Sequence, residues 1–379
     1  MPTYYNCHTH SFNYSHVPEY FLAVKVPGRF LAKTAAALIN APVIGKGLVK
    51  ILSVSAATRK YANFLAVGKM KTQDMVFEMV KAKYPPGTGI VVLPLCFDYM
   101  GAGKVNISYI QQLSELIDLK KKYPNECLPF VCVDPRMGTA EANRDFVKKY
   151  IDIGFSGIKM YPSLGYYPFD PRMKLVYEYA QENQVPLLTH CSRGGIHYVT
   201  QGKNIPADFL KPANLYPGDP IPAIDTSSVK MGDFKNNFIK TASYEEVLKR
   251  FPELKLCFAH FGADDDNPYP PGKDKLQGAN DWYHEIIRLM GNYENVYTDI
   301  SYSLTQKPFM DGFYKDYQTM PVKIKDRILY GTDFFMIEQE AENDDNQLFN
   351  DVKKLFGQVE FDKLASANVA AFLKTKVVN

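Results

Sequence analysis

The sequence predicts an α/β protein in which residues 1–379 form a single (β/α)8 barrel, or TIM barrel. Short apolar runs alternate along the chain with amphipathic stretches, a pattern typical of β-α units. The apolar runs are continuous, as expected of strands that are covered on both faces. The predicted strands and helices alternate in one order along the whole chain, without a reversal. No Gly-x-Gly-x-x-Gly follows the first run. Both observations favour a closed barrel over an open nucleotide-binding sheet. The eight predicted strands are Thr3–His8, Gly89–Leu95, Leu128–Val133, Phe155–Met160, Val185–His190, Leu254–His260, Asn295–Ile300 and Arg327–Gly331.

Helix-start signals lie between these strands. Ser108 and Ser243 each precede a Gln or Glu by three residues, which fits the capping box. Asp170 stands before a proline, so it is expected to cap a helix that has proline at its first position. Residues 360–377 are predicted to form the closing helix.

Two insertions interrupt the pattern. Residues 11–86, after the first strand, are predicted to form a helical cap over the barrel mouth or a subunit contact. Within them, residues 21–71 carry nine Lys or Arg and no acidic residue, so a membrane-surface role is the alternative. Residues 197–241, after the fifth strand, are rich in Pro, Gly, Asn and Asp, and we expect a long loop that acts as a lid.

Composition excludes several classes of protein. A hydrophobic fraction of 46% indicates a folded chain with a large core, and a net charge of +3 does not indicate a nucleic-acid partner. The apolar runs are too short for a membrane span, which needs roughly 20 residues. Six cysteines without paired spacing, and no secretory signal, favour a cytoplasmic protein with reduced thiols.

Histidines gather at the predicted strand ends. Four of the seven histidines, His8, His10, His190 and His260, end strands one, five and six, and Asp333 follows strand eight. The active site of an α/β barrel lies at the carboxyl ends of its strands. We therefore expect these five side chains to converge on one mouth.

The spacing of His8 and His10 suggests a metal site. Residues two apart on a strand point to the same face, about 6.6 Å apart along the backbone. Imidazole and carboxylate ligands suit zinc or a similar divalent ion. A lone pair of histidines at this spacing could equally be structural; the further strand-end histidines and Asp333 favour the metal.

Three basic residues are candidates for substrate binding, which implies a small, anionic substrate. Lys159 lies within the apolar fourth strand, where a lysine is rarely buried without a partner. It could bind an anionic group, carry a carbamate that bridges two metals, or form a salt bridge inside the barrel. Arg193 and Arg136 could hold a carboxylate through bidentate contacts, although Arg136 could equally be structural.

These motifs resemble those of the amidohydrolase superfamily, and most of all the amidohydrolase-related branch that includes aminocarboxymuconate-semialdehyde decarboxylase and lactone hydrolases. The resemblance implies one divalent metal ion, zinc or alternatively manganese, with a second only if Lys159 is carbamylated. It implies a homodimer, and Lys159 stands where the related TatD-like nucleases have a glutamate, which argues against a nuclease. The resemblance gives His8, His10, His190 and Asp333 as metal ligands, with His260 and Asp333 as acid/base residues. The matching segments are Cys-His8-Thr-His10, Gly-Ile-Lys159, Leu-Thr-His190, Phe-Ala-His260-Phe-Gly and Tyr-Gly-Thr-Asp333.

The leading hypothesis is a metal-dependent hydrolase of an amide, ester or lactone bond in a small, carboxylated substrate, with a metal-activated water as nucleophile. The second is a non-oxidative decarboxylase of an aromatic or muconate-type acid that uses the same residues. The third is a catalytically inactive barrel that serves as a binding protein.

Overall fold

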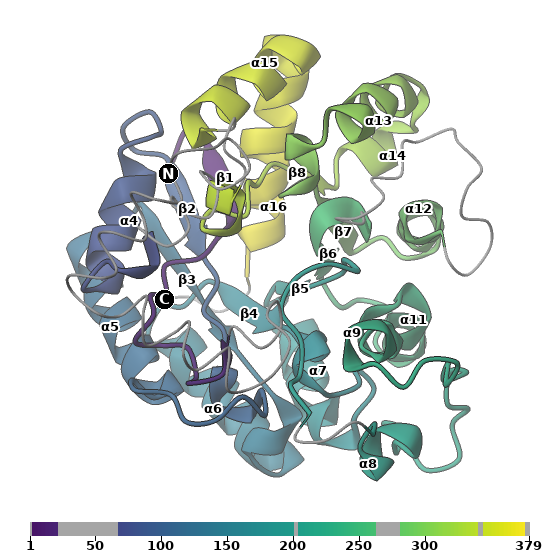
Figure 1. The fold of residues 1–379 in the computed structure, drawn as a ribbon. Coiled ribbons are helices and arrows are strands. Elements are labelled where there is room, and N and C mark those ends of the chain that lie inside the picture. The colour runs from purple at the N-terminus through teal and green to yellow at the C-terminus, as the bar shows by residue number, and fades with distance from the viewer. Residues whose placement is uncertain (1, 22–66, 201–203, 263–280, 340–343, 376–379) are drawn as a thin grey trace.

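The protein is described by a computed structural model that covers residues 2–21, 67–200, 204–262, 281–339 and 344–375. Eight parallel strands form one sheet in the order β1 to β8, and helices surround the ring of strands (Figure 1). The predicted eight-stranded α/β barrel is confirmed. The strands are β1 (Tyr5–Thr9), β2 (Gly89–Val92), β3 (Cys127–Cys132), β4 (Gly157–Met160), β5 (Leu187–Thr189), β6 (Leu256–Phe258), β7 (Val296–Asp299) and β8 (Ile328–Leu329).

Backbone hydrogen bonds close the ring between β8 and β1. The N–H of Cys7 donates to the carbonyl of Tyr330 at 3.0 Å, and the N–H of Asp333 donates to the carbonyl of His8 at 2.8 Å. The two segments approach closely at Gly331, where an added Cβ would lie 2.9 Å from the Cβ of His8. The barrel is therefore closed by residues that follow the short strand β8.

A buried apolar cluster fills the barrel interior. Every strand except β4 contributes to this cluster, as do Val369 and Phe372 of α16 (Asn368–Leu373). The ammonium of Lys255, just before β6, donates to the carbonyls of Ala371 and Lys374, at 3.2 and 2.6 Å, and so holds the end of α16. α16 therefore closes the amino-terminal end of the barrel.

The outer helices mostly begin as predicted. Ser108 caps α5 through a complete capping box, and Asp170 caps a 3-10 turn that leads into α7. The cap predicted at Ser243 is wrong: α11 begins two residues earlier, and the buried Ser243 hydroxyl donates to the carbonyl of Asn237 at 2.9 Å. The outer helices are α4 (Gln73–Lys81), α5 (Tyr109–Lys122), α6 (Ala140–Asp152), α7 (Lys174–Glu182), α11 (Thr241–Arg250), α12 (Trp282–Asn292), α13 (Lys307–Thr319), α14 (Val322–Lys325) and α15 (Asp345–Asp362).

The structure describes the two predicted insertions in part. Residues 22–66, most of the predicted 11–86 cap, lie outside the described residues. Of the described residues between β1 and β2, Gln73–Lys81 form the outer helix α4, which packs on α5. The 197–241 segment is less irregular than the predicted loop, because it contains the one-turn helices α8 (Ala207–Leu210), α9 (Met231–Phe234) and α10 (Asn236–Ile239). None of the helices that the structure describes has the length and hydropathy needed to cross a membrane.

The chain closes differently from the single predicted helix at 360–377. α15 begins at Asp345, a π-helical turn follows at 363–367, and α16 then turns into the base of the barrel. The six cysteines are all free and buried.

Candidate metal centre

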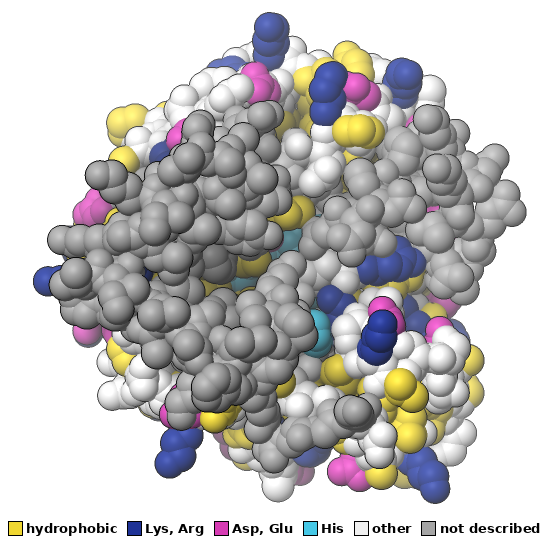
Figure 2. Space-filling view, viewed as in Figure 1, with side chains coloured by type: hydrophobic (Ala, Val, Ile, Leu, Met, Phe, Trp, Pro, Cys, Tyr) yellow, Lys and Arg dark blue, Asp and Glu magenta, His cyan; other side chains and the backbone are white. Residues whose placement is uncertain are grey.

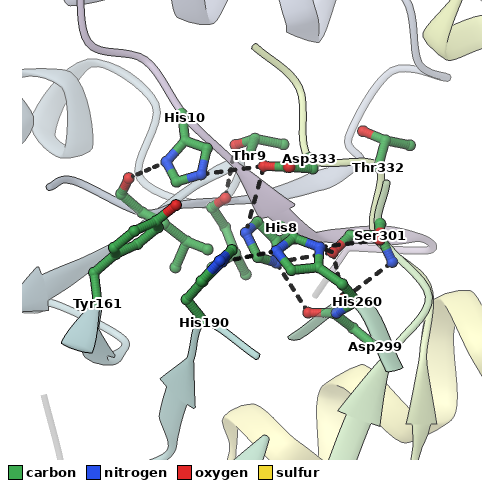
Figure 3. A network of polar contacts seen from close by, with 12 residues as sticks. His8, Thr9, His10, Tyr161, His190, His260, Asp299, Ser301, Thr332 and Asp333 are labelled. Carbon is green, nitrogen blue, oxygen red and sulfur yellow. Dashed lines mark hydrogen bonds and ion pairs between the residues drawn. The ribbon is translucent and has the colours of Figure 1, made fainter. Parts of the chain in front are cut away.

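Three of the predicted site residues meet at the carboxyl ends of β1 and β8. The Nε2 atoms of His10 and His8 lie 3.2 and 3.6 Å from Oδ1 of Asp333 (Figure 3). The side chains are buried, since His8, His10 and Asp333 are 1%, 3% and 5% exposed. Histidine side chains are visible near the centre of the view in Figure 2, next to hydrophobic side chains.

The hydrogen bonds of the two imidazoles show where their protons lie. Nδ1 of His8 is 2.9 Å from Oδ2 of Asp299, and Nδ1 of His10 is 2.6 Å from the carbonyl oxygen of Leu93. A carboxylate and a carbonyl only accept, so each Nδ1 donates, and in the neutral form of each ring the lone pair is on Nε2. This assignment follows from the hydrogen-bond network.

Three lone pairs therefore face one another in a buried space. Among the described residues, His8 Nε2 and Asp333 Oδ1 have no hydrogen-bond partner. Buried acceptors without a proton between them are costly, and a divalent cation between them would remove that cost. Two imidazole nitrogens and a carboxylate oxygen are also the ligand types that zinc and manganese accept. The residues present thus fit a divalent metal ion.

The charge states of these residues agree with such a site. Burial, and after it the positive charge of Lys159, lower the pKa of His8 to about 3, although Asp299 partly opposes them. His8 is thus neutral near pH 7, as a metal ligand must be. Burial alone would raise the pKa of Asp333, but the hydrogen bond and positive charge that the neighbouring imidazoles offer once protonated, those of His10 first, outweigh burial, so its pKa is lowered and the group is a carboxylate.

Asp299 is a site residue that the sequence reasoning missed. It ends β7, is 0% exposed, and accepts hydrogen bonds from His8 Nδ1 at 2.9 Å, the N–H of His260 at 2.9 Å and the N–H of Ser301 at 3.0 Å. A carboxylate on the far nitrogen of a ligating imidazole orients the ring and strengthens it as a ligand. The available signal was a carboxylate inside a predicted apolar strand, the same kind of signal that singled out Lys159.

His260 and His190 lie beside this cluster and contact each other. Nε2 of His260 is 3.2 Å from Nδ1 of His190, and Nδ1 of His260 is 3.0 Å from the carbonyl oxygen of Ser301. The ring of His190 stacks on Tyr161 at a centroid distance of 4.3 Å. In the described parts of the chain, His190 does not belong to the group of potential ligands formed by His8, His10 and Asp333. The predicted role of His190 as a metal ligand stays a prediction.

Two site residues have a strained backbone. His260 and Asp333 both have φ of 63°, in the left-handed region that residues other than glycine rarely adopt. Strain of this kind gathers at functional sites, where the surrounding structure enforces it. Both are the residues predicted to act as acid or base.

The three predicted substrate-binding residues have different surroundings. Lys159 is 0% exposed, its Nζ has no hydrogen-bond partner or ion pair among the described residues, and burial lowers its pKa to about 8. Arg136 is held by Asp134 through two contacts, at 2.8 and 2.6 Å. Arg193 lies over the ring of Trp282, 4.0 Å from its centroid. Their roles toward a substrate stay predictions.

The fold and the cluster together define a TIM-barrel protein with a candidate metal centre at the carboxyl ends of its strands. The amidohydrolase family matches the sequence over residues 96–375, so the chain belongs to this family, as its motifs predicted. No curated protein gives a match.

Several solved structures are similar to this chain at low sequence identity. An uncharacterized TIM-barrel protein from Bordetella bronchiseptica is 14% identical, with a TM-score of 0.52 over 97% of this chain and 98% of that one. A probable 2-pyrone-4,6-dicarboxylic acid hydrolase from Acinetobacter baumannii is 11% identical, with a TM-score of 0.49 over 79% and 88% of the two chains. A 5-carboxyvanillate decarboxylase from Novosphingobium aromaticivorans, complexed with manganese, is 12% identical, with a TM-score of 0.49 over 98% and 96%.

Proposed function

We propose that this protein is a metal-dependent hydrolase that cleaves an amide, ester or lactone bond in a small, carboxylated substrate. The observation that carries the proposal is the buried convergence of His8 Nε2, His10 Nε2 and Asp333 Oδ1, with no hydrogen-bond partner for two of these atoms among the described residues. We assign these three residues, with His190 as the fourth, as ligands of one divalent ion, zinc or alternatively manganese.

The protein's own residues supply proton transfer. A divalent ion held by His8, His10 and Asp333 would supply an acidified water and would polarise a carbonyl group. Asp333, whose lowered pKa keeps it ionised, takes the proton of the attacking water and passes it to the leaving group. His260 keeps its Nδ1 proton on the carbonyl oxygen of Ser301, so Nε2 is the atom that exchanges protons.

Lys159 supplies the positive charge for an anionic substrate. Its buried Nζ has no hydrogen-bond partner among the described residues, and an unpaired buried ammonium is costly to desolvate. An anionic group of the substrate would offset that cost as a counter-charge. Arg193 and Arg136 complete the proposed set of substrate-binding residues.

The first test is the metal content of protein purified without chelator or nickel resin. We expect about one equivalent of zinc or manganese, lost in a His8→Ala/His10→Ala variant and retained in His16→Ala. His16 is an equally buried histidine that contacts Glu115 instead, at 3.5 Å, and so serves as the matched control. No bound metal after reconstitution with divalent ions would overturn the proposal, and two equivalents would indicate a carbamylated Lys159.

The reaction is then tested with a panel of lactones, esters, amides and aromatic carboxylic acids. Hydrolysis products that depend on the metal support the hydrolase. Release of CO2 from a carboxylic acid, without hydrolysis of any panel member, would replace it with the decarboxylase. No turnover by metal-loaded protein across the panel would favour the inactive binding protein.

A further inference from the structure

β1 is irregular where it carries the first metal-ligand candidate. Its pairing with β2 shifts register between Asn6 and Thr9. Tyr5 and Cys7 both belong to the barrel-interior cluster, so strict alternation would turn His8 away from the interior. His8 instead reaches Asp299 inside the barrel. An irregularity that re-aims one side chain in this way is typical of strands beside active sites.

One side-chain oxygen satisfies the backbone donors at this irregularity. Oδ1 of Asn6 accepts from the N–H of His8 at 3.1 Å and from the N–H of Thr332 at 3.1 Å. Thr332 directly precedes Asp333 in the chain. Oδ1 of Asn6 therefore connects the backbone of β1 at His8 to the backbone next to Asp333, and both of these residues are ligand candidates.

The amide nitrogen of Asn6 fixes the orientation of this group. Nδ2 donates to the hydroxyls of Tyr84 and Thr332, both at 2.8 Å, and the Tyr84 hydroxyl donates to Asp345 at 3.0 Å. Rotating the amide by half a turn would place its N–H groups against the two backbone N–H groups. Asn6 is 0% exposed, and each of its donors and acceptors is used.

We propose that Asn6 is a positioning residue of the metal centre. It touches neither metal nor substrate; through the backbones of His8 and Thr332 it sets the separation between His8 Nε2 and Asp333 Oδ1. The inference rests on the proposed metal site. It predicts that metal affinity depends on Asn6, although Asn6 is not a metal ligand. Residues that orient metal ligands typically change affinity 10- to 100-fold when they are replaced.

The test compares Asn6→Ala with Asn143→Ala. Asn143 is an equally buried asparagine whose Nδ2 also donates twice, to the carbonyls of Pro135 and Arg172 at 3.2 Å. Zinc affinity is measured on metal-free protein by competition with a chromophoric chelator, and the melting temperature of the metal-free protein is measured in parallel. We expect both variants to melt lower, but only Asn6→Ala to bind zinc about 10- to 100-fold more weakly.

The conservative variant Asn6→Asp keeps an oxygen acceptor for both N–H groups, so it should bind zinc more tightly than Asn6→Ala. If Asn6→Ala does not fold, Asn6→Asp and Thr332→Val take its place. Thr332→Val removes one acceptor of Nδ2, and we expect it to bind zinc several-fold more weakly. Wild-type zinc affinity in Asn6→Ala, or in both substitutes, would overturn the role of Asn6 while leaving the proposed function intact. A wild-type protein that binds no metal would overturn the proposed function itself, and the role of Asn6 with it.

Discussion

His8 Nδ1 donates a hydrogen bond of 2.9 Å to Oδ2 of Asp299, and both side chains are buried inside the barrel. This contact holds the proton on Nδ1 and leaves the lone pair of Nε2 directed at Asp333. We expect Asp299→Asn to weaken zinc binding about 10-fold or more, because a neutral amide is a poorer acceptor and carries a donor of its own. Competition with a chelator measures the change.

The matched control is Asp281→Asn. Asp281 also accepts from a histidine Nδ1, that of His284, and from a backbone N–H, but it caps α12. It should leave zinc affinity unchanged. Equal affinities in the wild type and in Asp299→Asn would show that the orientation of His8 does not depend on Asp299.

Asp333→Asn should abolish turnover and leave the fold intact. Asparagine is among the few residues that tolerate the left-handed backbone, and Asp333 has φ of 63°. The amide cannot accept a proton from water, so we expect kcat to fall by about 10²- to 10⁴-fold with a melting temperature near that of the wild type. Unchanged turnover of an identified substrate would remove the acid/base role of Asp333.

Lys159 should make stability depend on pH. Burial lowers its folded-state pKa to about 8, whereas the unfolded chain keeps the ordinary value of 10.5. Between these values the unfolded state binds more protons, so this group makes the unfolding free energy rise with pH, and below about pH 8 it contributes no slope. Compared with Lys159→Met, metal-free wild type should gain stability from pH 8 to 10, by up to about 1.4 kcal/mol per pH unit.

Denaturant unfolding of both proteins across this range measures the difference. The exposed Lys315→Met on α13 controls for the removal of a lysine as such. A wild-type curve that stays parallel to that of Lys159→Met over the whole range would contradict the lowered pKa.

The cap of α5 offers a stability test away from the site. The hydroxyl of Ser108 accepts from the N–H of Gln111, and the Gln111 side chain accepts from the N–H of Ser108 at 3.0 Å. Ser108→Ala should lower the unfolding free energy by about 1 kcal/mol. Ser114→Ala, at an exposed interior position of the same helix, should not lower it, because alanine has the higher helix propensity. Equal effects of the two substitutions would mean that the cap adds nothing.

The barrel was predictable because its strands are buried on both faces, which leaves an unbroken apolar run for each of them. The convergence of His8, His10 and Asp333 followed from the rule that strand ends of a barrel share one mouth. The same rule applied to Asp299 would have found it, because Asp299 lies one residue before the end of the predicted seventh strand, and His190 lies at the end of the predicted fifth.

Other features depend on contacts that no local pattern encodes. The register shift between β1 and β2 lies where Asn6 accepts a hydrogen bond from Thr332, which is more than 300 residues away in the chain. The cap predicted at Ser243 failed because a buried carbonyl, that of Asn237, takes its hydroxyl. The contact between His190 and His260 likewise arises only when β5 and β6 lie side by side.

The helix α16, at the base of the barrel, limits the routes by which substrate and product can pass between the site and solvent. Because Val369 and Phe372 of α16 close the amino-terminal end, the described part of the chain leaves the opposite mouth as the route to solvent. Substrate and product then use the same route, and the product must leave before the next substrate can bind. A product that leaves slowly would block the entry of the next substrate molecule, so we expect steady-state rates to show competitive inhibition by product.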